Sequence, residues 1–251
     1  MRVLLSKAFV TAVLEKGIEI AIKNMTFARD SVQLYKKADE LKMVDIMQRI
    51  EQDLSASESD YQTWKVIRKD AEKAGCKNLV WLCNEKMAEV AITFEELDFL
   101  PFTDREYLYR MLKEAKTSYQ FKRVCIRCDG EVAPYFRAVS GMIKYALTCD
   151  DWLGVRSIVS NSHKYYEKSL SKAYAAAKDN LDYSNVLEAN IRKNNPLWND
   201  TLAKLIETST EAADLNIVFE NCEVGSDIEK SAIEKAKSLI RRLDDAIMAL
   251  T

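Results

Sequence analysis

The sequence predicts an all-α protein of about nine antiparallel helices. Glycine and proline are scarce, and apolar residues recur at helical spacing along the chain. The 251 residues include 6 Gly and 3 Pro, well below the roughly 7% and 5% of average usage. β-Hairpins, bulges and phosphate-binding loops need glycine at positive φ, and the sequence holds no G-x-G-x-x-G or G-x-x-x-x-G-K-[ST] motif. These observations disfavour a β-rich fold and a glycine-cradled nucleotide site.

The first hundred residues predict about four helices. Helix breaks are expected near residues 24–30, near residues 55–59 and at Gly75. Pro101 separates two further helices because proline breaks a helix interior, and Thr103 is the expected N-cap of the second. A boundary is also expected near residues 128–130, since Pro134 is tolerated only in the first turn of the helix that follows.

The C-terminal half predicts further helices over residues 163–179 and 182–193. Another opens at Asn195-Pro196 and ends near Asn221. Ser226 and Glu229 form a capping box that starts the last helix. Its apolar residues fall on one arc of about 100°: Ile228, Ala232, Ala236, Leu239, Leu243, Ala246, Ile247 and Leu250. Since no linker or clean repeat divides the chain, we expect a single domain over residues 1–251.

The charge balance and the cysteine content disfavour three classes of protein: nucleic-acid-binding, membrane-binding and disulfide-stabilised proteins. Lys and Arg number 37 against 39 Asp and Glu, a formal net charge of -2, so the chain as a whole would attract neither nucleic acid nor an anionic membrane. Six cysteines are too few for a disulfide scaffold in a chain of this length, and we expect reduced thiols in a cytoplasmic protein. The sequence contains no apolar stretch of about 20 residues that could span a membrane.

Two motifs raise the question of catalysis or metal binding. Cys125 and Cys128 form the one C-x-x-C pair, without the second pair that zinc needs, so we interpret them as ordinary helix-face residues. Arg156 precedes the sole histidine, His163, by seven positions, and this R-x6-H pattern resembles the signature of HEPN-type helical ribonucleases. In that alternative, Arg156 would neutralise phosphate and His163 would act as acid or base. Otherwise His163 is a surface residue.

The most basic stretch of the chain carries Lys113, Lys116, Lys122, Arg123 and Arg127. It is either an exposed helix face or an anion site, in which guanidinium groups would hold a phosphate by charge-assisted hydrogen bonds.

Five segments resemble the 14-3-3 family in the same order. Residues 121–139, FKRVCIRCDGEVAPYFRAV, are similar to SKVFYLKMKGDYYRYLAEV of that family. The other four segments are residues 61–67, similar to RSSWRVV, residues 157–169, similar to GIVDQSQQAYQEA, residues 187–190, similar to LALN, and residues 239–247, similar to LIMQLLRDNL. The resemblance covers roughly residues 55–251 of a chain of about the family's length.

This resemblance implies a concave nine-helix bundle that acts as a non-enzymatic adaptor without cofactor or metal. Such proteins form homo- or heterodimers through their N-terminal helices and hold phosphoserine or phosphothreonine peptides in an amphipathic groove. The match places Tyr135 at the phosphate-binding tyrosine, Arg127 at a groove lysine and Asn190 at the asparagine that contacts the peptide backbone. Leu239 and Leu243 stand near the apolar wall of the groove.

The chain departs from the family at its phosphate-binding cations. Pro134 stands where the family has an arginine, and no basic residue aligns near Leu54 or Tyr61. Each lost cation removes charged hydrogen bonds worth about 1.5–3 kcal/mol. We therefore expect the phosphate site to be rebuilt from Lys65, Lys122 or Arg137. The alternative is a helical scaffold that binds unphosphorylated partners through an apolar face.

Overall fold

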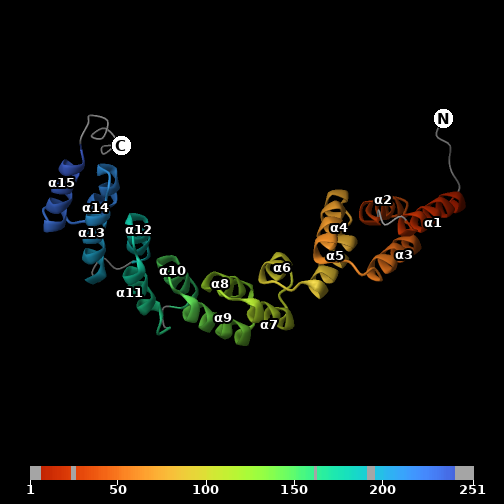
Figure 1. The fold of residues 1–251 in the computed structure, drawn as a ribbon, viewed down its shortest axis with the longest axis horizontal. Coiled ribbons are helices and arrows are strands. Elements are labelled where there is room, and N and C mark those ends of the chain that lie inside the picture. The colour runs from red at the N-terminus through yellow and green to blue at the C-terminus, as the bar shows by residue number, and fades with distance from the viewer. Residues whose placement is uncertain (1–6, 24–26, 161–162, 191–195, 241–251) are drawn as a thin grey trace. The chain divides into compact units, whose positions relative to one another are not determined.

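The computed structural model describes residues 7–23, 27–160, 163–190 and 196–240. Within these ranges it contains fifteen α-helices, one 3-10 helix and no strand (Figure 1), which confirms the all-α class. The helices are shorter and more numerous than the nine expected. None of those in the described ranges is long and apolar enough to cross a bilayer.

The helices divide into two compact units, Met1–Phe102 (unit 1) and Thr103–Thr251 (unit 2). The expectation that residues 1–251 form a single domain stays a prediction. Unit 1 contains α1 (Lys7–Lys23), α2 (Phe27–Glu40), α3 (Val44–Ser55), α4 (Tyr61–Ala74), α5 (Lys77–Val90) and α6 (Phe94–Phe99). In this unit, α4 packs on both α5 and α2.

Two helix breaks expected in unit 1 are present. Helix α3 ends at Ser55 and α4 starts at Tyr61, where the side chain of the N-cap Asp60 accepts a hydrogen bond from the Thr63 amide. Gly75 follows α4 in the left-handed region, with φ of 76°. A residue without Cβ adopts this conformation at little cost, which explains why the helix ends there. The break expected at residues 24–30 falls partly outside the described residues.

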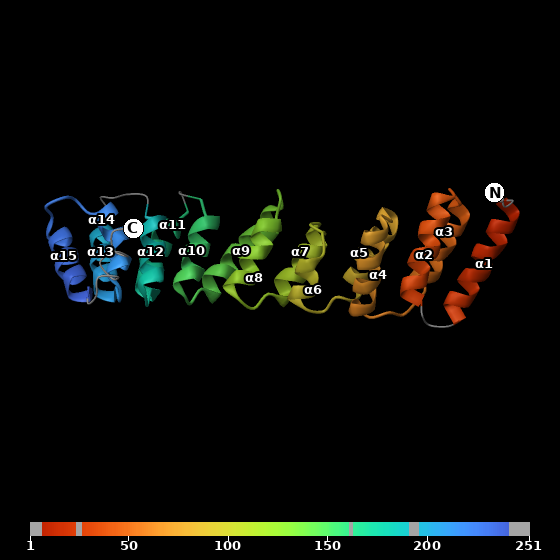
Figure 2. The same ribbon diagram turned by 90° about the horizontal axis from the view of Figure 1, so that it is seen from above.

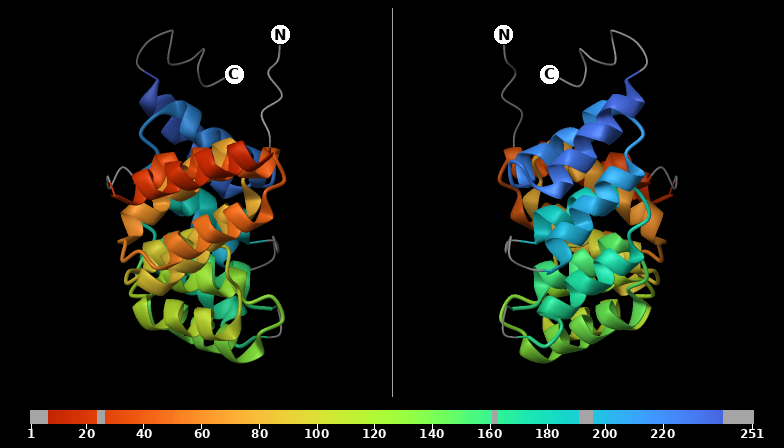
Figure 3. Two further views of the ribbon diagram at one scale, coloured as in Figure 1. Left: turned by 90° about the vertical axis from the view of Figure 1, so that its right-hand side faces the viewer. Right: turned by 90° about the vertical axis from the view of Figure 1, so that its left-hand side faces the viewer.

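Unit 2 is a series of helical hairpins. It contains α7 (Arg105–Glu114), α8 (Ser118–Arg127), α9 (Val132–Tyr145), α10 (Cys149–Ile158), α11 (Tyr166–Ala176), α12 (Asn180–Ala189), α13 (Pro196–Thr208), the 3-10 helix η1 (Ala212–Leu215), α14 (Asn216–Asn221) and α15 (Asp227–Leu239). Three hairpins, α8–α9, α10–α11 and α12–α13, each pack on the next (Figure 2). In the right-hand view of Figure 3 the helices of this unit follow one another in chain order.

These hairpins repeat, contrary to the expectation of no clean repeat. Val124, Val155 and Val186 are fully buried at 31-residue intervals on the first helix of each hairpin. On the second helix, the buried Ala138, Val139 and Met142 of α9 correspond to the buried Ser169, Leu170 and Ala173 of α11. The first helices also start alike, since Thr117 and Thr148 form capping boxes and Asp179 is an N-cap. Each hairpin buries its apolar face against its neighbours, as in helical-repeat proteins.

Local capping explains where several predicted helix boundaries differ from the observed ones. Helix α7 begins one residue later than expected, with Asp104 rather than Thr103 as its N-cap. The helix expected from Asn195 to Asn221 is instead α13, η1 and α14, because Glu211 and Asp214 form a new capping box. The last helix begins as predicted, with Ser226 accepting from the Glu229 amide. Its predicted apolar residues beyond Leu239 lie outside the described residues.

Candidate anion-binding site

The residues that the 14-3-3 resemblance assigned to phosphate and peptide lie where the first helix of each hairpin ends and the second begins. Arg127 is the last residue of α8 and is partly buried. Tyr135, in the first turn of α9, donates its hydroxyl to the Ile158 carbonyl at 2.9 Å. Burial raises the pKa of this phenol. The Tyr135 hydroxyl is therefore engaged within the fold.

Asn190 is the C-cap of α12 and is 2% exposed. Its Nδ2 atom is buried and has no hydrogen-bond partner in the described part of the chain. At this depth the amide does not face solvent. A role for Arg127, Tyr135 and Asn190 in binding a peptide stays a prediction.

The other predicted residues belong to different helices. Lys65 lies in unit 1, with its Nζ atom 5.0 Å from the centre of the Phe99 ring. Lys122 reaches from α8 towards α10, so that its Nζ atom would lie 3.7 Å from a Cβ added at Gly154. Leu239 packs against the hydrophobic core cluster formed by α12, α13, η1, α14 and α15. Leu243 lies outside the described residues.

Arg156 and His163, the residues of the ribonuclease alternative, both have partners within the fold. Arg156 donates from Nη1 to the Tyr166 carbonyl at 2.7 Å and from Nε to the Ala189 carbonyl at 3.2 Å. Its guanidinium carbon lies 3.9 Å from the centre of the Tyr166 ring. His163 Nδ1 accepts a hydrogen bond from the Tyr165 amide. Arg156 thus has the contacts of a residue that joins α10, α11 and α12.

The structure brings two arginines to one aromatic ring on α7 and α9. The guanidinium carbon of Arg137 lies 5.0 Å from the centre of the Tyr109 ring, and that of Arg105 lies 5.8 Å from it. Both arginines are exposed. In the residues that the structure describes, neither forms an ion pair or a hydrogen bond. We call Arg105, Tyr109 and Arg137 the α7–α9 cluster.

Local sequence places this cluster on the solvent side. Arg105 and Tyr109 are one turn apart, and α7 starts at Arg105 because the Asp104 side chain accepts from the Tyr107 amide at 3.0 Å. Tyr107, about 200° around the helix from Arg105, is buried on the opposite side of α7. On α9, five buried residues face the core and leave Arg137 outside, next to Phe136, which is 58% exposed.

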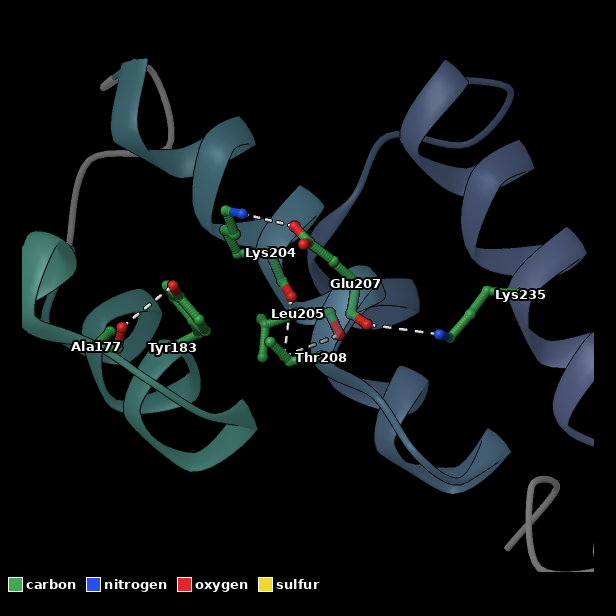
Figure 4. Close-up of polar contacts among 7 residues, drawn as sticks. All are labelled: Ala177, Tyr183, Lys204, Leu205, Glu207, Thr208 and Lys235. Carbon is green, nitrogen blue, oxygen red and sulfur yellow. Dashed lines mark hydrogen bonds and ion pairs between the residues drawn. The ribbon is translucent and has the colours of Figure 1, made fainter.

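The segment of the sequence that contains the cluster has an excess of basic residues, although Asp104 and Glu106 flank Arg105. Residues 103–178 hold fourteen Lys and Arg against eight Asp and Glu, whereas residues 179–251 hold eight against fourteen. Several charges of the C-terminal repeats are paired among themselves (Figure 4). Lys204 Nζ lies 2.6 Å from the Glu207 carboxylate, and Lys235 Nζ lies 3.4 Å from the Glu207 carbonyl. The hydrogen bond with Lys204 lowers the pKa of Glu207, and that with Glu207 raises the pKa of Lys204.

Two guanidinium groups beside one ring can bind an oxyanion. A guanidinium offers five N–H donors in a fork that matches carboxylate and phosphate oxygens. Sequence reasoning named Arg137 and missed Arg105 and Tyr109. The i, i+4 spacing of Arg105 and Tyr109 was visible, but their approach to Arg137 follows from the docking of α7 on α9.

No group of three or more His, Cys, Asp or Glu that could hold a metal ion occurs among the described residues. No protein-family model, curated protein or solved structure matches the chain.

Proposed function

We propose that the chain is a non-enzymatic adaptor that binds phosphorylated segments of partner proteins through the α7–α9 cluster. The observation that carries this proposal is the pair of arginines, Arg105 and Arg137, which share the Tyr109 ring and have no anionic partner within the described chain. Hydrogen bonds from such cations to phosphate are shorter and stronger than neutral ones. The exposed Phe136 ring offers apolar area for a neighbouring peptide side chain.

The proposal keeps the ligand class that the 14-3-3 resemblance implies and changes the site. In the family-based version, a 14-3-3-like groove would hold the phosphate at Tyr135 and Arg127. We favour the α7–α9 cluster because the Tyr135 hydroxyl is already bonded to Ile158 and Asn190 is buried. Arg137 belongs to both versions, as a residue from which the phosphate site was expected to be rebuilt.

Fluorescence anisotropy of labelled peptides, with and without one phosphoserine, tests this function. We expect Arg105→Gln and Arg137→Gln each to weaken binding of the phosphopeptide by roughly 10- to 150-fold, the equivalent of about 1.5–3 kcal/mol. Lys204→Gln is the matched control, since it removes a cation that is already paired with Glu207. Equal binding of the two peptides, or full affinity in both arginine variants, would refute the proposal.

We also propose that the adaptor dimerises through α1. Phe9, Val13 and Ile20 are each about half exposed and fall on one face of this helix at i, i+4 and i+11. An apolar stripe of this kind is typical of a helix that packs on a partner. Light scattering should show a dimer that becomes a monomer in the Val13→Glu/Ile20→Glu variant, and a monomeric unmutated chain would contradict it.

A further inference from the structure

A second aromatic ring of unit 2 is also surrounded by nitrogen-bearing side chains. Lys164 Nζ and Lys168 Nζ lie 5.5 Å and 5.6 Å from the centre of the Tyr165 ring. The His163 ring stacks beside the same ring at a centroid distance of 5.8 Å. Both lysines are exposed, and neither has an ion pair in the part of the chain that the structure describes. We call His163, Lys164, Tyr165 and Lys168 the α11 cluster.

The nearest acidic residue in sequence does not neutralise this cluster. Glu167 lies between the two lysines in sequence, but its carboxylate is 3.9 Å from Arg156 Nη1. His163 Nδ1 accepts from the Tyr165 amide, so the neutral ring carries its proton on Nε2. Nε2 is then a donor, and the lysine ammonium groups supply the charge.

The α11 cluster stands one repeat after the α7–α9 cluster. Lys168 follows Arg137 by 31 residues. The residue after each is buried, Ala138 on α9 and Ser169 on α11, and so are the residues that continue the same face of each helix. Lys168 therefore takes on α11 the position that Arg137 takes on α9.

We propose that the α11 cluster is a second anion site, and that the ligand of this chain is a doubly phosphorylated protein segment that reaches both clusters. This inference rests on the proposed function, because the first phosphate occupies Arg105 and Arg137. Two tethered anionic groups that bind two sites on one chain gain affinity through the high effective concentration of the second group.

Two observations favour a short, doubly anionic peptide over single-stranded nucleic acid. Proteins that bind single strands stack successive bases on open aromatic faces, whereas the Tyr109 and Tyr165 rings are approached by their own cations. In addition, the excess of acidic residues begins at residue 179, directly after the basic segment. A long polyanion that extended beyond the two clusters would be repelled by this negative charge. A short segment with two phosphates would not extend that far.

The test compares peptides that carry no phosphoserine, one phosphoserine or two phosphoserines. In the doubly phosphorylated peptides, a glycine-serine linker of increasing length joins the two phosphoserines. At the best linker we expect the doubly phosphorylated peptide to bind at least about 10-fold tighter than the singly phosphorylated one. The Lys164→Gln/Lys168→Gln variant should lose this gain and keep the affinity for one phosphate. Lys230→Gln/Lys237→Gln, which removes two exposed and ion-paired lysines of α15, is the matched control.

The outcomes separate the two proposals. If one phosphate binds through Arg105 and Arg137 but a second adds nothing, the second site is refuted and the proposed function stands. Persistence of the gain in the Lys164→Gln/Lys168→Gln variant also refutes the second site. If no peptide binds, both proposals fall. A single-stranded oligonucleotide that binds more tightly than the doubly phosphorylated peptide, through the same lysines, would overturn the peptide as ligand.

Discussion

Replacing Arg156 by methionine should destabilise unit 2 strongly, because methionine keeps an unbranched apolar stem but has no hydrogen-bond donor. The Arg156 side chain is 10% exposed and joins three helices. It donates to the carbonyls of Tyr166 and Ala189 and stacks on the Tyr166 ring at 3.9 Å. Methionine would fill the space of the Arg156 stem but leave both carbonyls without their donor.

The magnitude follows from these contacts. Two hydrogen bonds from a charged donor contribute about 1.5–3 kcal/mol each, and a desolvated cation–π contact adds about 2 kcal/mol. The cost of burying the guanidinium offsets part of this sum. We therefore expect Arg156→Met to lower the free energy of unfolding by about 3–5 kcal/mol, and Arg156→Lys, which keeps one bond and the charge, by about half as much.

Urea denaturation followed by circular dichroism measures the loss, with Arg137→Met as an exposed control that should change stability by less than about 0.5 kcal/mol. A loss below about 1 kcal/mol in Arg156→Met would refute the structural role of this side chain. The same measurement bears on the ribonuclease alternative. If Arg156→Lys kept full stability and abolished an RNA-cleaving activity of the chain, the result would show that Arg156 binds the RNA phosphate rather than joining the helices.

Three further predictions concern packing, thiols and charge. Gly141→Ala would place a Cβ 2.4 Å from the Phe121 ring and should cost about 1–3 kcal/mol in urea denaturation, whereas Gly154→Ala, with its nearest contact at 3.5 Å, should not destabilise the fold. Burial raises to about 12 the pKa of three thiols, those of Cys83, Cys125 and Cys149. Because the folded state holds these protons more tightly, their contribution to stability should persist up to pH about 8.5 and decline above it. All three should resist maleimide at pH 8 until urea is added, and rapid labelling of any of these three residues in the native chain, located by peptide mapping, would contradict their burial. Ser140→Glu, one turn after Arg137, should slightly stabilise α9 and weaken phosphopeptide binding, and unchanged binding would show that Arg137 does not contact the phosphate.

The helix boundaries that could be predicted are those set by local backbone chemistry. Gly75 ends α4 because of its positive φ, and Pro101 falls in the break between α6 and α7. The missed boundaries are capping boxes such as those of Thr93 and Thr117, where a short polar side chain starts a new helix inside a long helical pattern. Such residues also occur within helices, so their effect depends on how the next helix packs.

The repeat is hard to see in the sequence because it conserves burial at most positions and residue identity at few, such as the three valines at 124, 155 and 186. At one position of the first helix, successive hairpins carry Phe121, Trp152 and Tyr183, each buried and 31 residues from the next. These side chains differ in size and polarity, so a comparison of letters finds little, while each fills the same layer between hairpins. Without the repeat, the sequence offered no means of placing Arg137 beside α7, and the candidate site could be predicted only in part.

The two parts of unit 2, residues 103–178 and 179–251, differ in how many basic residues they carry. They differ more in whether those basic residues form ion pairs. On α13 and α15, lysines such as Lys204 and Lys237 have a glutamate three residues away and form ion pairs with it. Arg105, Arg137 and Lys168 have no acidic residue at i±3 or i±4, and Lys164, which has Glu167 at i+3, forms no ion pair with it in the described residues. Exposed pairs contribute only about 0.2–0.5 kcal/mol, so stability alone selects weakly for or against them. Cations that surround an aromatic ring without forming ion pairs are better explained by a ligand that supplies the negative charge. For this reason we expect the ligand to bind at the α7–α9 and α11 clusters rather than at the more numerous paired charges.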